Sequence, residues 1–126
     1  ITGKAKWEYD KGTPYVPSPL LMDAKLYFTQ ANLGLLTCLN AKNGKVLIDR
    51  QRLPGLTSVY GSPAGASGRI YIPGREGVCL VLKDLGGKVD ILASNKLGEG
   101  IDASPALVGK QLFLRGEKHL YCIEGK

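Results

Sequence analysis

Short stretches of alternating apolar and polar residues, separated by glycine-containing turns, recur along the whole chain. Three of them, KLYFTQ, RIYIPG and QLFLRG, each place two apolar side chains on one face of an extended strand, because successive side chains in a strand point to opposite faces. These pairs are Leu26 and Phe28, Ile70 and Ile72, and Leu112 and Leu114. No stretch keeps a helical apolar period for three turns, so the pattern predicts an all-β protein.

The alternating stretches belong to a longer repeat. The dipeptide Ser-Pro begins at Ser18, Ser62 and Ser104, which lie 44 and 42 residues apart. Each is followed by an apolar pair, a turn, the alternating strand, and a third strand with a cysteine: LLTCLN, GVCLVL and HLYCIE. Gly-Lys then opens a fourth strand, as in NGKVLIDR and GGKVDILA. Four short strands in each repeat of this length are typical of the blades of a β-propeller.

The third repeat has only three of its four strands at the end of the sequence. Its fourth strand corresponds to TGKAKWEYD, which precedes TPYVPSP as NGKVLIDRQ precedes TSVYGSP. We therefore divide the single β-propeller segment 1–126 into blade repeats 18–61, 62–103, and 104–126 completed by 1–17. Three four-stranded antiparallel blades fall short of the usual four to eight. The sequence thus predicts part of a larger ring, completed by blades of a longer parent chain or of other copies.

This arithmetic predicts twelve strands, with Ser-Pro opening each innermost strand. The last strand and the segment around Trp7 are expected to pair between different molecules or with a missing part of the parent chain. Head-to-tail pairing of two copies would give six blades, which lies within the usual range.

The runs TGKAKW and CLNAKNGKVL resemble the docking repeat of pyrroloquinoline-quinone-type β-propellers. The resemblance extends over all three repeats and is closest in character to quinone-free members, such as the propeller lipoprotein of outer-membrane β-barrel assembly. It implies a propeller fold, a periplasmic or other extracytoplasmic location, and an inter-blade docking role for Trp7. Ile48 and either Ile91 or Leu92 stand at the matching positions of the other repeats.

The same family includes quinoprotein dehydrogenases, which carry a vicinal disulfide, a calcium site built from Glu and Asn, and a catalytic Asp. This sequence has no adjacent pair of cysteines, and the other positions find no match. A non-catalytic scaffold that binds a protein or peptide is therefore the preferred interpretation, with no catalytic, cofactor or metal residue assigned. The alternative is a fragment of a quinoprotein-like oxidoreductase whose ligands for pyrroloquinoline quinone (PQQ) and calcium lie in absent blades.

We interpret the cysteines, the histidine and Asp102 as structural rather than catalytic residues. Cys38, Cys79 and Cys122 align in successive third strands, which predicts three free and mostly buried thiols in different blades. They also lack the short spacings of a metal site. His119 is the only histidine, and no hydrolase motif accompanies it. Asp102 enters an inner strand, and we interpret it as a solvated turn residue rather than a general base.

The net charge of +6 gathers on one predicted face of the propeller. The connections between first and second strands and between third and fourth strands carry Lys4, Lys25, Lys42, Lys45, Arg69, Lys83, Lys88, Lys110 and Lys126. These residues recur because the turn recurs, and exposed aromatic residues are not interleaved with them, so we interpret them as solubilising rather than as nucleic-acid-binding. The longest apolar runs are only a few residues, so no transmembrane segment is expected.

The opposite face mixes aromatic, polar and charged residues, which is the composition of recognition surfaces. We call it the mixed loop face. It is formed by the connections between fourth and first strands and between second and third strands, and its candidate binding residues are Tyr15, Asn32, Ser58, Tyr60, Arg75, Glu76, Asp102, Arg115 and Glu117.

Overall fold

The computed structural model describes residues 2–31 and 33–125, and it confirms an all-β fold built from propeller-type blades. The first blade contains β1 (Leu20–Met22), β2 (Lys25–Thr29), β3 (Leu35–Asn40) and β4 (Val46–Arg52). The second contains β5 (Ala64–Ala66), β6 (Arg69–Pro73), β7 (Val78–Asp84) and β8 (Val89–Lys96). The third contains β9 (Ala106–Val108), β10 (Gln111–Arg115) and β11 (Leu120–Glu124). Within the described residues there is no helix that could cross a membrane.

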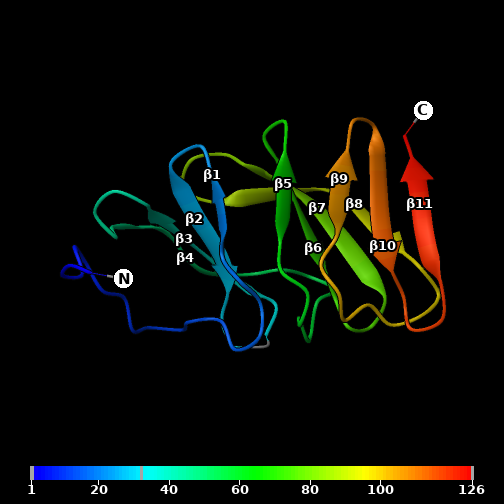
Figure 1. Cartoon of the computed structure of the whole chain (residues 1–126), viewed down its shortest axis with the longest axis horizontal. Helices are drawn as coiled ribbons and strands as arrows, with labels where there is room; N and C mark the ends of the chain where they lie inside the picture. The colour runs from blue at the N-terminus through cyan, green and yellow to red at the C-terminus, as the bar shows by residue number, and fades with distance from the viewer. Residues whose placement is uncertain (1, 32, 126) are drawn as a thin grey trace.

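Within each blade the strands pair in chain order and antiparallel, and the three sheets follow one another along the longest axis of the molecule (Figure 1). The turns between the first two strands favour this pairing. Asp23 and Ala24 have φ angles of 51° and 61°, and Ser67 and Gly68 have 51° and 72°. Two consecutive positive φ angles are typical of the tight turn whose twist matches a hairpin.

Each Ser-Pro dipeptide directly precedes the innermost strand of its blade, as predicted. These serines also connect neighbouring blades. The backbone N–H of Ser18 donates to Oγ of Ser62 at 2.8 Å, and the N–H of Ser62 donates to Oγ of Ser104 at 2.9 Å. We call this chain of hydrogen bonds the serine relay. It ties the entrances of β1, β5 and β9 together, so the repeat in sequence becomes a repeat of inter-blade contacts.

The expected fourth strand of the third blade is not formed, so the described chain has eleven strands rather than twelve. Residues 2–13 belong to no sheet, and a single bridge joins Pro14 to Ala31. The physical reason is distance: the N-terminal segment and β11 lie at opposite ends of the long axis (Figure 1), so neither can supply backbone partners to the other within one chain.

The core lies between consecutive blades. We call the side of a blade that faces the next blade its forward face, and the opposite side its rear face. Tyr27 and Cys38 of the first forward face pack with Ile70 and Ile72 of the second rear face in one buried cluster. The second forward face meets the third rear face in a smaller cluster, where only Cys79, Ile101 and Leu114 are fully buried. The predicted pairing of Ile70 with Ile72 and of Leu112 with Leu114 on one face is therefore confirmed.

The cysteines depart from the sequence prediction in two ways. Cys38 pairs with Tyr27 and Cys122 with Phe113, but the equivalent Tyr71 pairs with Val81, so Cys79 lies two residues earlier in its strand. All three thiols are free, yet Cys122 is exposed because no further blade covers it in this structure. Burial raises the pKa of Cys38 to about 11 and that of Cys79 to about 12, so both are poor nucleophiles.

Candidate binding surface

The mixed loop face is organised by one backbone contact that recurs in every blade. The turn between second and third strands donates a backbone hydrogen bond to the loop that enters the same blade. Ala31 donates its N–H to the carbonyl of Thr13 at 2.7 Å, Arg75 to that of Ser58 at 2.9 Å, and Glu117 to that of Gly100 at 3.0 Å. Loops that are far apart in sequence therefore form one continuous surface.

Arg75 is at the centre of this surface. Its Cζ lies 3.8 Å from the ring centroid of Tyr60, and its Nε donates to Oδ1 of Asp102 at 2.8 Å. The hydrogen bond to Asp102 raises the pKa of Arg75, so the guanidinium is charged at any physiological pH. The side chains of Arg75 and Asp102 are 40% and 45% exposed. A stacked and hydrogen-bonded arginine is thus held in one orientation while facing solvent.

Two glutamates fix the loops around Arg75. Glu76 accepts hydrogen bonds from the N–H and the hydroxyl of Thr57, at 3.1 and 3.4 Å. Glu99 accepts the N–H groups of Lys118 at 3.0 Å and His119 at 3.2 Å. The ring Nδ1 of His119 also lies 3.3 Å from Glu99, which gives this histidine a structural role in the β10–β11 turn. Sequence reasoning missed Glu99, because no motif signals a contact between residues nineteen positions apart with β9 and β10 between them.

The structure brings together six of the nine candidate residues, which we call the Arg75 cluster: Ser58, Tyr60, Arg75, Glu76, Asp102 and Glu117. Tyr15 is 74% exposed and lies beside Ala31 of the first blade, outside this cluster. Arg115 is exposed at the end of β10, opposite Leu120. Asn32 lies outside the described residues.

Trp7 packs against the turn between β3 and β4 of the first blade. Its Nε1–H donates to the carbonyl of Ala41 at 3.1 Å. A Cβ atom at Gly44 would lie only 2.7 Å from Trp7 Cε3, so the close approach of the indole requires glycine there. Gly44 also has a φ of 73°, which favours glycine independently.

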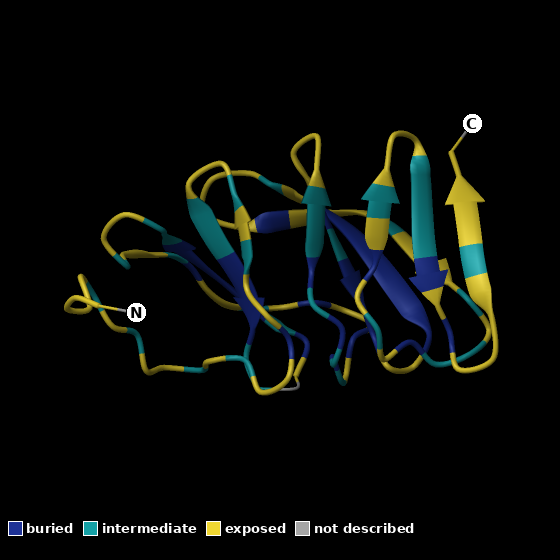
Figure 2. Cartoon of the chain, in the orientation of Figure 1, coloured by how far each residue is buried: buried dark blue, intermediate teal, exposed yellow. Residues whose placement is uncertain are grey.

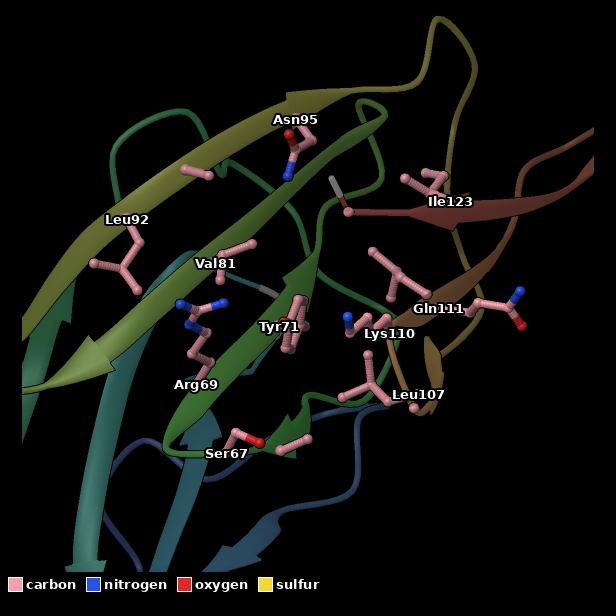
Figure 3. A pocket seen from close by; sticks show the side chains of 15 residues that line it. Ser67, Arg69, Tyr71, Val81, Leu92, Asn95, Leu107, Lys110, Gln111 and Ile123 are labelled. Carbon is pink, nitrogen blue, oxygen red and sulfur yellow. The ribbon is translucent and has the colours of Figure 1, made fainter.

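A cleft that sequence reasoning did not predict separates the second and third blades (Figure 3). Its volume is about 760 Å³. Arg69, Tyr71 and Asn95 line it on the second blade, and Lys110, Leu112 and Ile123 line it on the third. The equivalent space between the first and second blades is closed by side chains.

Asp84 provides that closure between the first and second blades. It accepts hydrogen bonds from the Tyr27 hydroxyl at 2.5 Å and from Lys25 Nζ at 2.9 Å. Burial of Asp84 opposes its ionisation, but the hydrogen bonds from Tyr27 and Lys25 outweigh burial and lower the pKa of the carboxyl. In the third blade the register places Gly125 where Asp84 stands, so among the described residues no side-chain carboxylate stands at this position for Tyr71 and Arg69 of the second blade.

No protein-family model matches the sequence, and no curated protein matches it either. The crystal structure of the computationally designed Ika4 protein is similar over 84% of this chain and 63% of that protein, with a TM-score of 0.66 and 13% identity. BamB from Moraxella catarrhalis is similar over 84% of this chain and 41% of its own, with a TM-score of 0.44 and 13% identity. The chain thus spans less than two thirds of either protein. At this identity the likeness to Ika4 concerns the fold alone, and it supports the propeller type.

Proposed function

We propose that this chain is a non-catalytic propeller module that recognises a protein or peptide through the Arg75 cluster of its mixed loop face. Membership of the pyrroloquinoline-quinone-like repeat family forms part of this proposal and rests on the docking runs around Trp7 and Gly44. The observation that carries the proposal is the fixed, solvent-facing guanidinium of Arg75 between Tyr60 and Asp102.

Arginine and tyrosine dominate the binding energy of many protein interfaces, because both give a large contact area at a low entropic cost once they are held in place. The contact of Arg75 with Asp102 uses Nε. Among the described residues its terminal nitrogens make no hydrogen bond, so they are available to a carboxylate or a backbone carbonyl of a partner. The ring of Tyr60 offers apolar area beside them.

The oxidoreductase alternative has no supporting observation in this chain. The buried thiols have raised pKa values, and the histidine is engaged with Glu99.

Selection of a random peptide display library against the chain tests the proposal. Selected peptides should bind the wild type, and Arg75→Ala or Tyr60→Ala should each weaken binding about tenfold or more, which corresponds to roughly 1.4 kcal/mol. Lys110→Ala, on the opposite face, is the matched control and should change nothing. Selected peptides that bind Arg75→Ala and Tyr60→Ala as tightly as the wild type would refute the assignment of the surface.

A further inference from the structure

Equivalent positions on the three forward faces differ in what covers them. Leu36 in β3, Cys79 in β7 and Leu120 in β11 share one register position. Leu36 and Cys79 are fully buried because the next blade covers them, whereas Leu120 is 74% exposed. Cys122 is likewise exposed where its counterpart Cys38 is buried. Figure 2 shows the same contrast between exposed β11 and buried β7. The third forward face therefore has the apolar character of an inter-blade surface without a blade upon it.

The rear face of the first blade is covered, although the described residues before β1 form no blade. The N-terminal segment, residues 7–14, lies over Leu26, Phe28 and Leu39. The ring of Tyr9 packs edge-on against Phe28, with centroids 5.8 Å apart. Phe28 is 5% exposed and Leu39 is 1% exposed.

This segment follows the course of the last strand and entry loop of a preceding blade. The hydrogen bond from Ala31 N–H to the carbonyl of Thr13 is equivalent to the one from Arg75 N–H to the carbonyl of Ser58 in the next repeat. Trp7 reaches forward to the carbonyl of Ala41, as a side chain of β4 reaches forward to β8. By the contacts of Trp7, Tyr9 and Thr13, this segment lies where a fourth strand and its entry loop would lie, but without the third strand on which such a strand would pair.

We propose that a second copy of this chain docks on the forward face of the third blade. Its first blade covers Leu120 and Cys122, and its residues 3–10 pair with β11 as the missing fourth strand. The contact continues the two interfaces already present between consecutive blades. The serine relay extends across it, from the N–H of Ser104 to Oγ of the partner's Ser18. Two such contacts close a ring of six blades, with the same patch pair used twice.

The cleft between the second and third blades is explained by the same missing strand. In the first pair of blades, Gln51 of β4 closes the outer end with two hydrogen bonds to the backbone of Val89, at 2.9 and 2.8 Å. Asn95 holds the equivalent register position in β8, since it lies opposite Cys79 as Gln51 lies opposite Leu36. Asn95 lines the open cleft instead. The partner's residues 3–10 would bring a backbone to this amide, so the site is complete only in the pair.

Sedimentation equilibrium of the 126-residue chain tests the proposal. The wild type should form one species of twice 13.5 kDa. Leu120→Asp should be a folded monomer, because a carboxylate cannot be buried unpaired in that contact. Leu85→Asp is the matched control, since Leu85 is also exposed, at 52%, but lies in the β7–β8 turn. A wild-type monomer at every accessible concentration, or a Leu120→Asp variant that still pairs, would overturn the proposal.

Two further measurements test the head-to-tail geometry. The double variant Ala5→Pro and Lys6→Pro removes two N–H donors from the segment that would pair with β11, and it should abolish the pair. The circular dichroism spectrum of this variant should match that of the wild type, because residues 5 and 6 belong to no sheet within their own chain. Labelling of Cys122 should slow at least about tenfold as the wild type pairs, and not in Leu120→Asp. A proline variant that still pairs would show that the contact lies elsewhere. So would a labelling rate of Cys122 that does not depend on protein concentration.

Discussion

The two interfaces between consecutive blades repeat the same order and antiparallel pairing of the first three strands, yet one is closed and the other is open. The first buries a cluster that runs from Tyr27 and Leu36 to Leu80 and Val89, and it is closed by the polar contacts of Asp84 and Gln51. The second keeps the cleft of about 760 Å³. The comparison shows that the repeat determines how the blades stack. A few non-repeated residues and the fourth strand determine whether side chains fill the space between two consecutive blades.

The largest expected difference between the interfaces is in apolar burial. Ile70 and Leu112 occupy equivalent positions, but Ile70 is fully buried and Leu112 is only partly buried beside the cleft. Ile70→Ala should lower the free energy of unfolding by about 2–5 kcal/mol, whereas Leu112→Ala should cost about 1 kcal/mol. Urea unfolding at a concentration where the chain is monomeric measures both. Equal losses would mean that the two interfaces are equally packed.

The next effect concerns Asp84. Asp84→Asn should lower the free energy of unfolding at pH 7 by about 1–3 kcal/mol, because Lys25 loses its ionised partner in a largely buried site. Gly125→Asp is the reciprocal change. It places a carboxylate toward Tyr71 and Arg69, where a Cβ meets open space, and should add no more than about 1 kcal/mol. If Asp84→Asn leaves the free energy of unfolding unchanged, the hydrogen bonds of Asp84 do not close the first interface.

The same carboxyl gives a pH dependence with a defined sign. The pKa of folded Asp84 lies below its ordinary value of 3.8, so the ionised group stabilises the fold above that pH. Its contribution should disappear as the pH falls through the lowered folded-state pKa. The difference in stability between wild type and Asp84→Asn, followed by urea unfolding from pH 6 downwards, should therefore shrink only below about pH 4. A difference that shrinks at higher pH would assign the effect to another group.

The smallest effect concerns the amides. Gln51→Ala removes two hydrogen bonds to Val89 and should cost about 1 kcal/mol. Asn95→Ala, at the equivalent position beside the cleft, should lie within about 0.5 kcal/mol of the wild type in the monomer. If both variants behave alike, the fourth strand of the second blade does not close the first interface.

Much of this fold could be predicted from the sequence because its signals are local. Strand alternation placed Ile70 and Ile72 together, and the spacing of Ser-Pro located the innermost strands. The alignment of Cys79 failed because the cysteine does not keep its register position in the second blade: Val81 stands opposite Tyr71, where Cys38 and Cys122 stand in the other blades, and Cys79 lies opposite Pro73 instead. Matching residue letters cannot detect such a change, whereas pairing with β6 does.

The candidate site was predicted only in part. The loops of Tyr60, Arg75 and Asp102 could be assigned to one face from the blade topology, although their mutual contacts depend on side-chain orientation. Residues 2–10 were expected to hold a strand, but they belong to no sheet, and Trp7 and Tyr9 pack on the first blade instead, because a strand needs a partner backbone. The contacts of Asp84 with Lys25 and Tyr27 join residues 59 and 57 positions apart, and no sequence pattern specifies them.

Site-resolved thiol labelling of the monomeric chain tests the contrast between the interfaces most directly. Cys38 lies in the closed interface and Cys79 in the open one, both fully buried, while Cys122 is exposed and serves as the internal reference. Cys79 should label through opening of the third blade, faster than Cys38 and with a weaker dependence on urea. Cys38 should label only at the rate of global unfolding. Identical rates and identical urea dependence for Cys38 and Cys79 would contradict the account, because the two interfaces would then open as one unit.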